Sequence, residues 1–354
     1  MYRPRLLTPG PVELHPKAQE ALARPQLHHR SDAAKKIFLQ AKAGLEAAFQ
    51  TKGQALLLTG SGTAGMDALV HNLFAPGERV LVPVHGNFSE RWAKIAQEAG
   101  LQVERLELPW GQVVRPEHME SASGPFAGLL LTHSESSTGA LNDVRALAQV
   151  FKARFPEALV VVDAITSLFV SPFALEGWGL DAAVAGSQKG LMCPPGLAYV
   201  ALSPRAIERL KPRGFYLNLA SELKVQSSGE SAWTPAINLV AATAAVLEEL
   251  LPRLEEHLAL KKQQNDLLYA TGEQLGLQVV PEVRSSATTC FYLPEGISYG
   301  QVKNAFAARG ATIIGGQGQL KGKVFRLSLM GYSDLYDAYA VAQMLREVWA
   351  ELLA

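Results

Sequence analysis

The apolar residues of this chain follow two different patterns along its length. Between about residue 33 and residue 250, short apolar runs alternate with longer stretches whose apolar positions recur with the helical period. Helices are indicated at Met66–Phe74, Glu90–Ala99 and Val144–Arg154. The short runs indicate strands at Ala55–Thr59, Val80–Val84, Val103–Leu108, Gly128–Thr132, Leu159–Asp163, Ala182–Ala185 and Leu197–Ala201. This alternation predicts an α/β fold, a mostly parallel sheet sandwiched by helices.

The C-terminal part of the chain follows the second pattern. A long helical region is indicated from Pro235 to about Gly276, and Pro252 predicts a break in it. Strands are then indicated at Leu277–Val280, Thr288–Leu293, Thr312–Ile314 and Val324–Leu329, with a helix at Tyr299–Ala308. Ser333 is expected to cap a last helix that ends at Leu353. We therefore expect a small α+β domain at residues 251–354 and a large domain at 21–250. Residues 1–20, with four prolines, are expected to form an irregular arm.

Composition and charge exclude several classes of protein. Lys plus Arg and Asp plus Glu both number 33, and this zero net charge argues against nucleic-acid and anionic-membrane binding. Cys193 and Cys290 are the only cysteines, so neither a disulfide framework nor a metal site is expected. The first residues lack the apolar core of a signal peptide, and no apolar run is long enough to span a membrane. We expect a cytoplasmic protein with no membrane partner.

Two reactive side chains follow predicted strands. Asp163 ends the run Leu159–Asp163, and Lys189 lies among small residues just after Ala182–Ala185. An amine whose pKa is lowered by partial burial can form an imine with a carbonyl carbon. A carboxylate at a strand end can hold the ring proton of pyridoxal 5'-phosphate. Together the two residues predict an enzyme that uses this cofactor, with Lys189 and Asp163 as catalytic residues.

Two further segments are candidates for ligand binding. Gly60-Ser61-Gly62-Thr63-Ala64-Gly65 follows a strand and opens a helix, a pattern that favours an anion at the helix N-terminus. A single phosphate is the preferred ligand, with a dinucleotide or a merely tight turn as alternatives, because no acid ends the second strand. His133–Gly139 places hydroxyls and one acid after another strand, either in the ligand crevice or as the N-cap of a helix near Asn142.

Taken in order, these motifs resemble those of the class V (subgroup IV) pyridoxal-phosphate-dependent aminotransferases of the alanine/serine–glyoxylate type. The resemblance covers most of the chain and implies the fold type I of these transferases. It is carried by Thr8-Pro9-Gly10-Pro11, Gly60-Ser61-Gly62-Thr63, Glu135-Ser136-Ser137-Thr138-Gly139, Asp163, Ser187-Gln188-Lys189, Thr234-Pro235 and Phe325-Arg326-Leu327-Ser328-Leu329-Met330-Gly331.

The resemblance also implies a role for each matching residue. Lys189 would form the internal aldimine with the cofactor, and Asp163 would pair with its ring nitrogen. Ser136 would hydrogen-bond the phenolic oxygen, and Phe88 would stack on the ring. Thr234 would reach the phosphate of the other subunit's cofactor, which implies a homodimer. The cofactor phosphate would be held by Ser61, Gly62, Thr63 and Gln188. The expected substrate-binding residues are Gly10, Arg326, which would grip the α-carboxylate as a planar fork, and Arg30.

Two departures from the family pattern bear on these roles. A tyrosine often found three residues before the partner-subunit threonine is here Ser231. The family's His-Arg-Ser-Pro-Glu-Phe stretch survives only in its first half, His29-Arg30-Ser31. The first puts the cross-subunit contact in question, and the second the substrate-entry role.

The implied activity is transamination between a small amino acid, alanine or serine, and a 2-oxo acid, glyoxylate or pyruvate. Aspartate or phosphoserine is the alternative donor, if Arg30 or a lysine of the glycine-rich stretch 315–323 meets a second anionic group. That stretch otherwise indicates a flexible hairpin loop. A cysteine desulfurase-like lyase and an NAD-dependent oxidoreductase are less favoured, since the former needs a reactive cysteine and the latter rests only on the glycine pattern.

Overall fold

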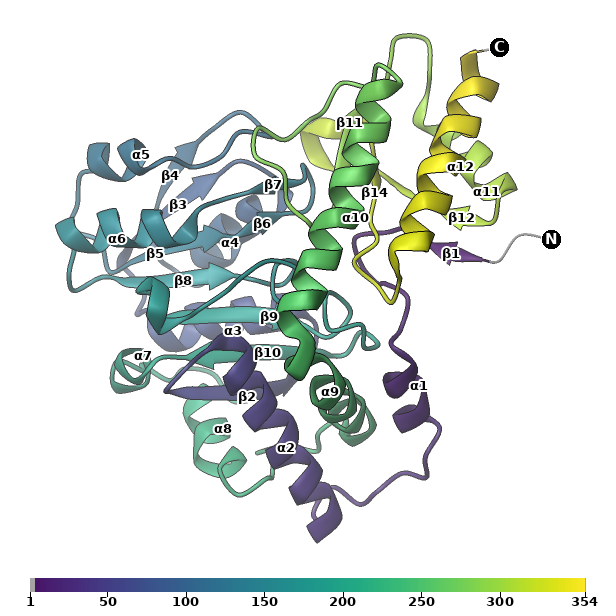
Figure 1. The fold of residues 1–354 in the computed structure, drawn as a ribbon. Coiled ribbons are helices and arrows are strands. Elements are labelled where there is room, and N and C mark those ends of the chain that lie inside the picture. Colours follow the sequence, from purple (N-terminus) through teal and green to yellow (C-terminus); the bar gives the residue numbers. More distant parts are fainter. Residues whose placement is uncertain (1–3, 354) are drawn as a thin grey trace.

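A seven-stranded sheet forms the centre of the protein, whose computed structural model describes residues 4–353 (Figure 1). Its strand order is β2-β10-β9-β8-β5-β3-β4, and all neighbours are parallel except β10, which is antiparallel to β2 and β9. The strands are β2 (Gln54–Thr59), β3 (Arg79–Val84), β4 (Gln102–Glu107), β5 (Gly128–Thr132), β8 (Leu159–Asp163), β9 (Ala182–Gly186) and β10 (Leu197–Leu202). The predicted mostly parallel sheet is confirmed.

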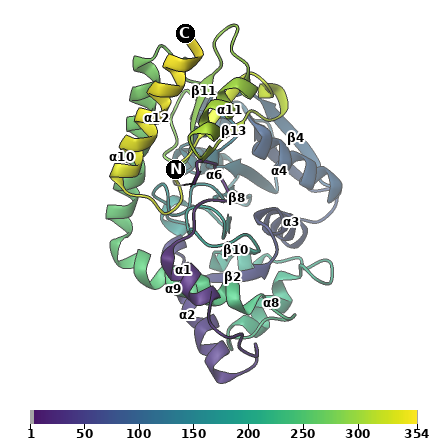
Figure 2. The same ribbon diagram turned by 90° about the vertical axis from the view of Figure 1, so that its right-hand side faces the viewer.

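Helices cover both faces of this sheet. Alternate residues of one strand enter two different cores: Leu56 and Leu58 of β2 pack in one, and Ala55 and Leu57 in the other. Figure 2 shows α3 and α4 on one side of the sheet and α9 on the other. The first face is covered by α3 (Gly62–Leu73), α4 (Asn87–Glu98), α7 (Pro204–Glu208) and α8 (Leu219–Gln226). The second is covered by α1 (Pro16–Leu22), α2 (Asp32–Phe49), α5 (Pro116–Ser121), α6 (Val144–Arg154) and α9 (Ile237–Leu250). Burial of both strand faces explains why the strands are continuous apolar runs.

The C-terminal residues build a separate apolar cluster beside the sheet. A 3-10 turn, Leu251–Arg253, separates α9 from α10, so the predicted break at Pro252 is confirmed. A three-stranded antiparallel sheet, in the order β11-β14-β13, packs Phe291 and Phe325 with Trp349. The unit contains α10 (Leu254–Gln274), β11 (Thr289–Tyr292), α11 (Tyr299–Ala308), β12 (Ala311–Thr312), β13 (Ile314–Gly315), β14 (Val324–Leu327) and α12 (Leu335–Leu353). The division into domains 21–250 and 251–354 stays a prediction.

Three local predictions for this unit are wrong. Leu277–Val280 is not a strand, because only Val279 forms a bridge, with Phe291, before Pro281 removes the next backbone donor. Thr312–Ile314 is split between two sheets, since β12 pairs with the arm and β13 pairs with β14. The side chain that caps α12 is Asp334, whose Oδ1 accepts the Asp337 N–H at 2.9 Å, and not Ser333.

The N-terminal arm is more regular than predicted. Strand β1 (Arg5–Leu6) pairs in parallel with β12, and Leu7 and Val12 are buried. Pro16 stands at the first position of α1, where the missing N–H costs no hydrogen bond, and His15 is the N-cap. Proline therefore begins a helix here and does not prevent one.

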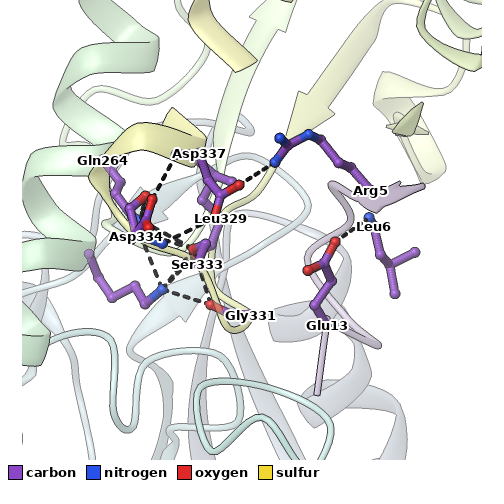
Figure 3. Close-up of polar contacts among 10 residues, drawn as sticks. Arg5, Leu6, Glu13, Gln264, Leu329, Gly331, Ser333, Asp334 and Asp337 are labelled. Atoms are coloured by element: carbon purple, nitrogen blue, oxygen red, sulfur yellow. Dashed lines mark hydrogen bonds and ion pairs between the residues drawn. The ribbon is translucent and has the colours of Figure 1, made fainter. Parts of the chain in front are cut away.

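A buried lysine ties helix α10 to the turn after β14 within the C-terminal unit (Figure 3). Lys261, on α10, donates to the carbonyls of Leu329 and Gly331 at 2.9 and 2.7 Å and to Ser333 Oγ at 3.1 Å. Figure 3 also shows Arg5 of the arm paired with Asp337 at the start of α12. Burial lowers the pKa of Lys261 to about 7. This network fixes the turn that follows β14, the strand that carries Arg326.

Within residues 4–353, none of the helices combines the length and apolar character that crossing a membrane requires.

Candidate active site

The candidate residues gather where the parallel strands end. Asp163 is the last residue of β8, whose arrowhead in Figure 1 points toward the C-terminal unit. Lys189 follows β9 in the same way, and α3 and α4 begin just after β2 and β3. This carboxyl edge is where α/β sheets bind their ligands.

Lys189 is buried in a place that keeps its amine reactive. Its side chain is 8% exposed, and its Nζ donates to the carbonyl oxygen of Pro9 in the arm. Burial lowers the pKa of Lys189 to about 8, Asp163 opposes this shift, and the cations Arg326 and Arg91 add to it. A pKa this low leaves part of the amine neutral near neutral pH, as a nucleophile or base requires.

Asp163 lies within electrostatic reach of that amine. Burial raises the pKa of Asp163 to about 7, and the Ile165 N–H, which donates to its Oδ1 at 2.8 Å, opposes the shift. Glu135 raises the same pKa, while Arg91 and Lys189 lower it. A cation placed opposite a buried carboxylate stabilises its charged form.

Gly10 of the arm packs directly against the Lys189 amine. Its φ is +120°, and a Cβ added there would lie 2.5 Å from Lys189 Nζ. The arm can therefore approach the amine only with glycine at this position.

We expect Gly10→Ala to lower activity by about 10-fold or more, because it strains the backbone and displaces the amine. The measurement is kcat with saturating cofactor, with thermal unfolding as the check on the fold. Gly77→Ala is the control, since that glycine also has a positive φ, +84°, but nothing lies within 4 Å of an added Cβ. Equal losses in the two variants would contradict a role for the Lys189 contact.

The segment Gly60–Thr63 forms a cradle at the start of α3. Ser61 is the N-cap, yet its side chain makes no capping hydrogen bond. A Cβ on Gly62 would meet the Ile165 side chain at 2.6 Å, so the segment fits closely over the loop that follows Asp163. The first N–H groups of this helix and two hydroxyls are thus placed to receive an anion.

Two buried polar atoms at the same edge of the sheet lack a partner. Ser136 Oγ and Gln188 Oε1 have no hydrogen-bond partner among residues 4–353. Such orphaned atoms call for an explanation in a native fold, and a polar ligand is one. They follow β5 and β9, so both belong to the edge that holds Lys189 and Asp163. The hydroxyl of Ser136 can donate or accept and the amide oxygen of Gln188 accepts, and together with the cradle they fit a phosphorylated cofactor that carries further polar groups.

Glu135 fixes the start of α4, a role that its sequence context does not reveal. Its carboxylate accepts the N–H groups of Phe88, at 3.1 and 3.2 Å, and Ser89, at 2.9 Å. A carboxylate at a helix N-terminus is favoured by the helix dipole. Glu135 lies in the hairpin of β6 (Ser134–Glu135) and β7 (Ala140–Leu141), and Asp143 is the N-cap of α6. The hydroxyl cluster is therefore part of the site edge, and the N-cap alternative is wrong.

Arg326 reaches the site from the C-terminal unit. It is 1% exposed, and its Nε and Nη2 donate to the Gly315 carbonyl at 3.0 and 2.8 Å. Its Nη1 donates to the Ser136 carbonyl at 2.6 Å. The neighbouring stretch 315–323 contains a 3-10 turn at Gly318–Leu320, and both of its lysines, Lys321 and Lys323, are exposed.

Two expected site residues lie outside this group in the single chain. Thr234 is exposed on the segment before α9. Arg30 is exposed just before α2, which begins at the bottom of Figure 1, away from the central sheet. The charge of Arg30 lowers the pKa of Glu230, which lies four residues before Thr234. The segments that carry Arg30 and Thr234 are therefore neighbours.

Comparisons with known proteins agree with this geometry. A model of the aminotransferase class-V family matches residues 14–339. The chain is 67% identical to the aspartate aminotransferase of subgroup IV from Thermus thermophilus, with a TM-score of 0.96 and coverage of 98% and 99% of the two chains. It is 30% identical to the alanine–glyoxylate aminotransferase from Nostoc sp., with a TM-score of 0.92 and coverage of 100% and 96%. It is 31% identical to the L-aspartate–glyoxylate aminotransferase of Paracoccus denitrificans, over 95% of this chain and 88% of that protein.

The chain belongs to the class V aminotransferase family. It has the fold of pyridoxal-phosphate-dependent transferases, and it is an enzyme that transfers amino groups between amino acids and 2-oxo acids. The resemblance stated from the motifs is confirmed. Membership implies pyridoxal phosphate as the cofactor.

Proposed function

We propose that this protein binds pyridoxal phosphate at Lys189 and prefers L-aspartate as its amino donor. The observation that carries the donor assignment is the 67% identity, over 98% of the chain, to a protein named aspartate aminotransferase. This reverses the order expected from the motifs alone, in which alanine and serine come first and aspartate second. Alanine stays the second candidate, because a structure with 30% identity is named for it.

Each residue of the site has a task in this proposal. When bound, pyridoxal phosphate supplies an aldehyde that condenses with an amine and a protonated ring that takes up the electron pair released at the α-carbon. Asp163 holds the proton on the ring nitrogen, Ser136 offers its unpaired hydroxyl, and the cradle at the start of α3 holds the phosphate.

Lys189 and Arg326 act on the substrate. The amine of Lys189 would remove the substrate's α-proton and deliver it to the cofactor's C4′ carbon, and burial keeps its pKa low enough for it to act as base. Arg326 binds the α-carboxylate through a guanidinium fork that backbone carbonyls already orient. Because Lys189 and Arg326 would hold the substrate in a fixed position, the proton transfer becomes effectively intramolecular.

Reductive trapping tests the cofactor assignment. Apoprotein is mixed with pyridoxal phosphate, reduced with borohydride and digested, and the modified peptide is identified by mass spectrometry. We expect the phosphopyridoxyl group on Lys189. Modification of another lysine, or of none, would refute the proposal.

Single-turnover reactions with individual amino acids test the donor. The loaded enzyme is mixed with aspartate, alanine, serine or phosphoserine, and loss of the visible absorbance band is followed. We expect the highest kcat/KM with aspartate. A higher value with alanine or serine would return the assignment to the second candidate.

We also propose a homodimer in which one subunit completes the other's site. Thr234 is exposed next to a group of partly exposed aromatic side chains, Phe215, Tyr216 and Trp233, of which Phe215 is 79% exposed. The Tyr216 hydroxyl donates to the Thr59 carbonyl at 3.3 Å, which places this apolar surface beside the phosphate cradle. An exposed apolar surface next to a site is typical of an interface.

Arg30 would then meet the distal carboxylate of aspartate in the partner's site, because it neighbours the Thr234 segment. In a dimer of this kind, Arg30→Ala slows the reaction with aspartate but not with alanine. Lys36→Ala is the matched control, an exposed cation near the start of the same helix. Equal slowing with both donors would contradict a distal anion site at Arg30.

Neither cysteine of the chain has the environment of a reactive thiol, which a cysteine desulfurase requires. Cys193 and Cys290 are both buried, and burial raises the pKa of each to about 12. A nucleophilic cysteine needs the thiolate near neutral pH, and neither environment provides it.

A further inference from the structure

Arg91 makes two contacts that link separate parts of the site. It lies on α4, one helical turn after Phe88, so the two side chains share a face of the helix. Its Nη1 donates to Thr63 Oγ1 at 2.8 Å, and its Cζ lies 4.8 Å from the centroid of the Phe88 ring. One guanidinium therefore touches both the phosphate cradle and the aromatic residue expected to stack on the cofactor.

The hydrogen bond to Thr63 sets the direction of that hydroxyl. A threonine hydroxyl has one proton to donate and accepts through its lone pairs. Because Thr63 Oγ1 accepts from Arg91, its own proton stays available for an anion at the start of α3. The positive charge behind the hydroxyl makes it a stronger donor.

The charge of Arg91 is not neutralised by an ion pair. No carboxylate of residues 4–353 lies within ion-pair distance of Arg91, whereas its neighbour Glu90 pairs with Arg105 and Lys94. Arg91 also acts electrostatically on Lys189 and Asp163. It lowers the pKa of both, with an effect smaller than that of burial. An unpaired cation beside a helix N-terminus is suited to a phosphate dianion.

We propose that Arg91 is a positioning residue for the cofactor, which orients Thr63 toward the phosphate and supports the Phe88 ring on the face opposite the cofactor. The inference rests on the proposed function, since it assumes that pyridoxal phosphate occupies the site. It assigns Arg91 no contact with the substrate.

Cofactor titrations test this role. The apoprotein's Kd for pyridoxal phosphate and for pyridoxal, which lacks the phosphate, is measured by fluorescence quenching. We expect Arg91→Gln to raise the Kd for pyridoxal phosphate by about 10-fold or more, the scale of one charge-assisted hydrogen bond. The Kd for pyridoxal should rise by a clearly smaller factor, because only the support of Phe88 is lost. Lys94→Gln is the matched control, which removes a cation from the same helix and should leave both constants within about two-fold.

A double-mutant cycle separates this role from a general loss of structure. In the Thr63→Val background, Arg91→Gln should weaken pyridoxal phosphate binding by a smaller factor than in the wild-type background. Arg91→Lys, which keeps the charge but loses the fork, should fall between wild type and Arg91→Gln. The proposal is overturned if Arg91→Gln binds the cofactor as tightly as wild type. It is also overturned if Arg91→Gln raises the Kd by the same factor with threonine and with valine at position 63. Wild-type protein that binds no pyridoxal phosphate would instead overturn the proposed function.

Discussion

Lys189→Ala is expected to abolish turnover. In the proposed mechanism the variant loses both the attachment point of the cofactor and the base for the α-proton, and removing a general base alone costs about 10²–10⁴-fold. The structure explains the size of the effect: the amine is buried, its pKa is lowered to about 8, and Gly10 and Pro9 confine it.

Steady-state rates with the preferred donor measure this effect. Cofactor binding is measured separately, so that loss of the cofactor is not mistaken for loss of the base. Adding a small amine such as methylamine should restore part of the rate, because it can enter the space left by the side chain. A variant that turns over substantially without added amine would show that Lys189 is not the base.

Replacing Asp163 with asparagine is expected to lower kcat by about 10²–10⁴-fold, the range typical of lost proton control at a reacting group. An amide of nearly the same shape cannot hold a proton on the ring nitrogen. Reconstitution with a cofactor methylated at that nitrogen, which is permanently charged, should restore part of the loss. Unchanged kcat in Asp163→Asn would contradict the assigned role.

The same residue should leave a signature in the stability of the cofactor-free protein. Burial raises the pKa of Asp163 from 3.8 to about 7, so the folded state holds a proton that the unfolded state has released. The resulting stabilisation is complete below about pH 4 and is lost as the pH rises through about 7. Lys189 affects stability in a different pH range. Its pKa is about 8 in the folded state and 10.5 in the unfolded state, so stability rises with pH between these values.

Urea unfolding of the apoprotein on both sides of pH 7 detects this signature. Asp163→Asn should flatten the pH dependence of the free energy of unfolding between about pH 4 and pH 7. The charged groups that act on this carboxyl are Glu135, Arg91 and Lys189. An equally steep dependence in the variant would assign the proton to another group.

The sequence predicted best the features that depend on continuous patterns. The strands of the central sheet are buried on both faces, so their apolar runs are unbroken and their ends, such as Asp163, are clear. The break at Pro252 also follows from local chemistry, whereas α3 begins at Gly62, four residues before the predicted Met66. Residues at strand ends, including Lys189 and Ser136, could be assigned to one edge of the sheet for the same reason.

Features that depend on contacts between distant segments were missed or misjudged. Nothing in the local pattern of Arg5–Leu6 shows that it pairs with Ala311–Thr312, about 300 residues away. Glu135 and Arg91 were not assigned roles, because their partners Phe88 and Thr63 lie in other segments. The spacing of three between Phe88 and Arg91 was the one available signal, and it indicates a shared helical face but not a shared task.

In its proposed role as carboxylate anchor, Arg326 would bind the substrate by exchanging hydrogen bonds that it already makes. Three of its five N–H donors are bound to the carbonyls of Gly315 and Ser136, which belong to segments far apart in the chain. An incoming anion must use the two remaining donors or displace a carbonyl, and a neutral ligand gains too little from either to compete. If Arg326 is the anchor we propose, selectivity for acids over amides and esters follows from hydrogen bonds present before any substrate arrives.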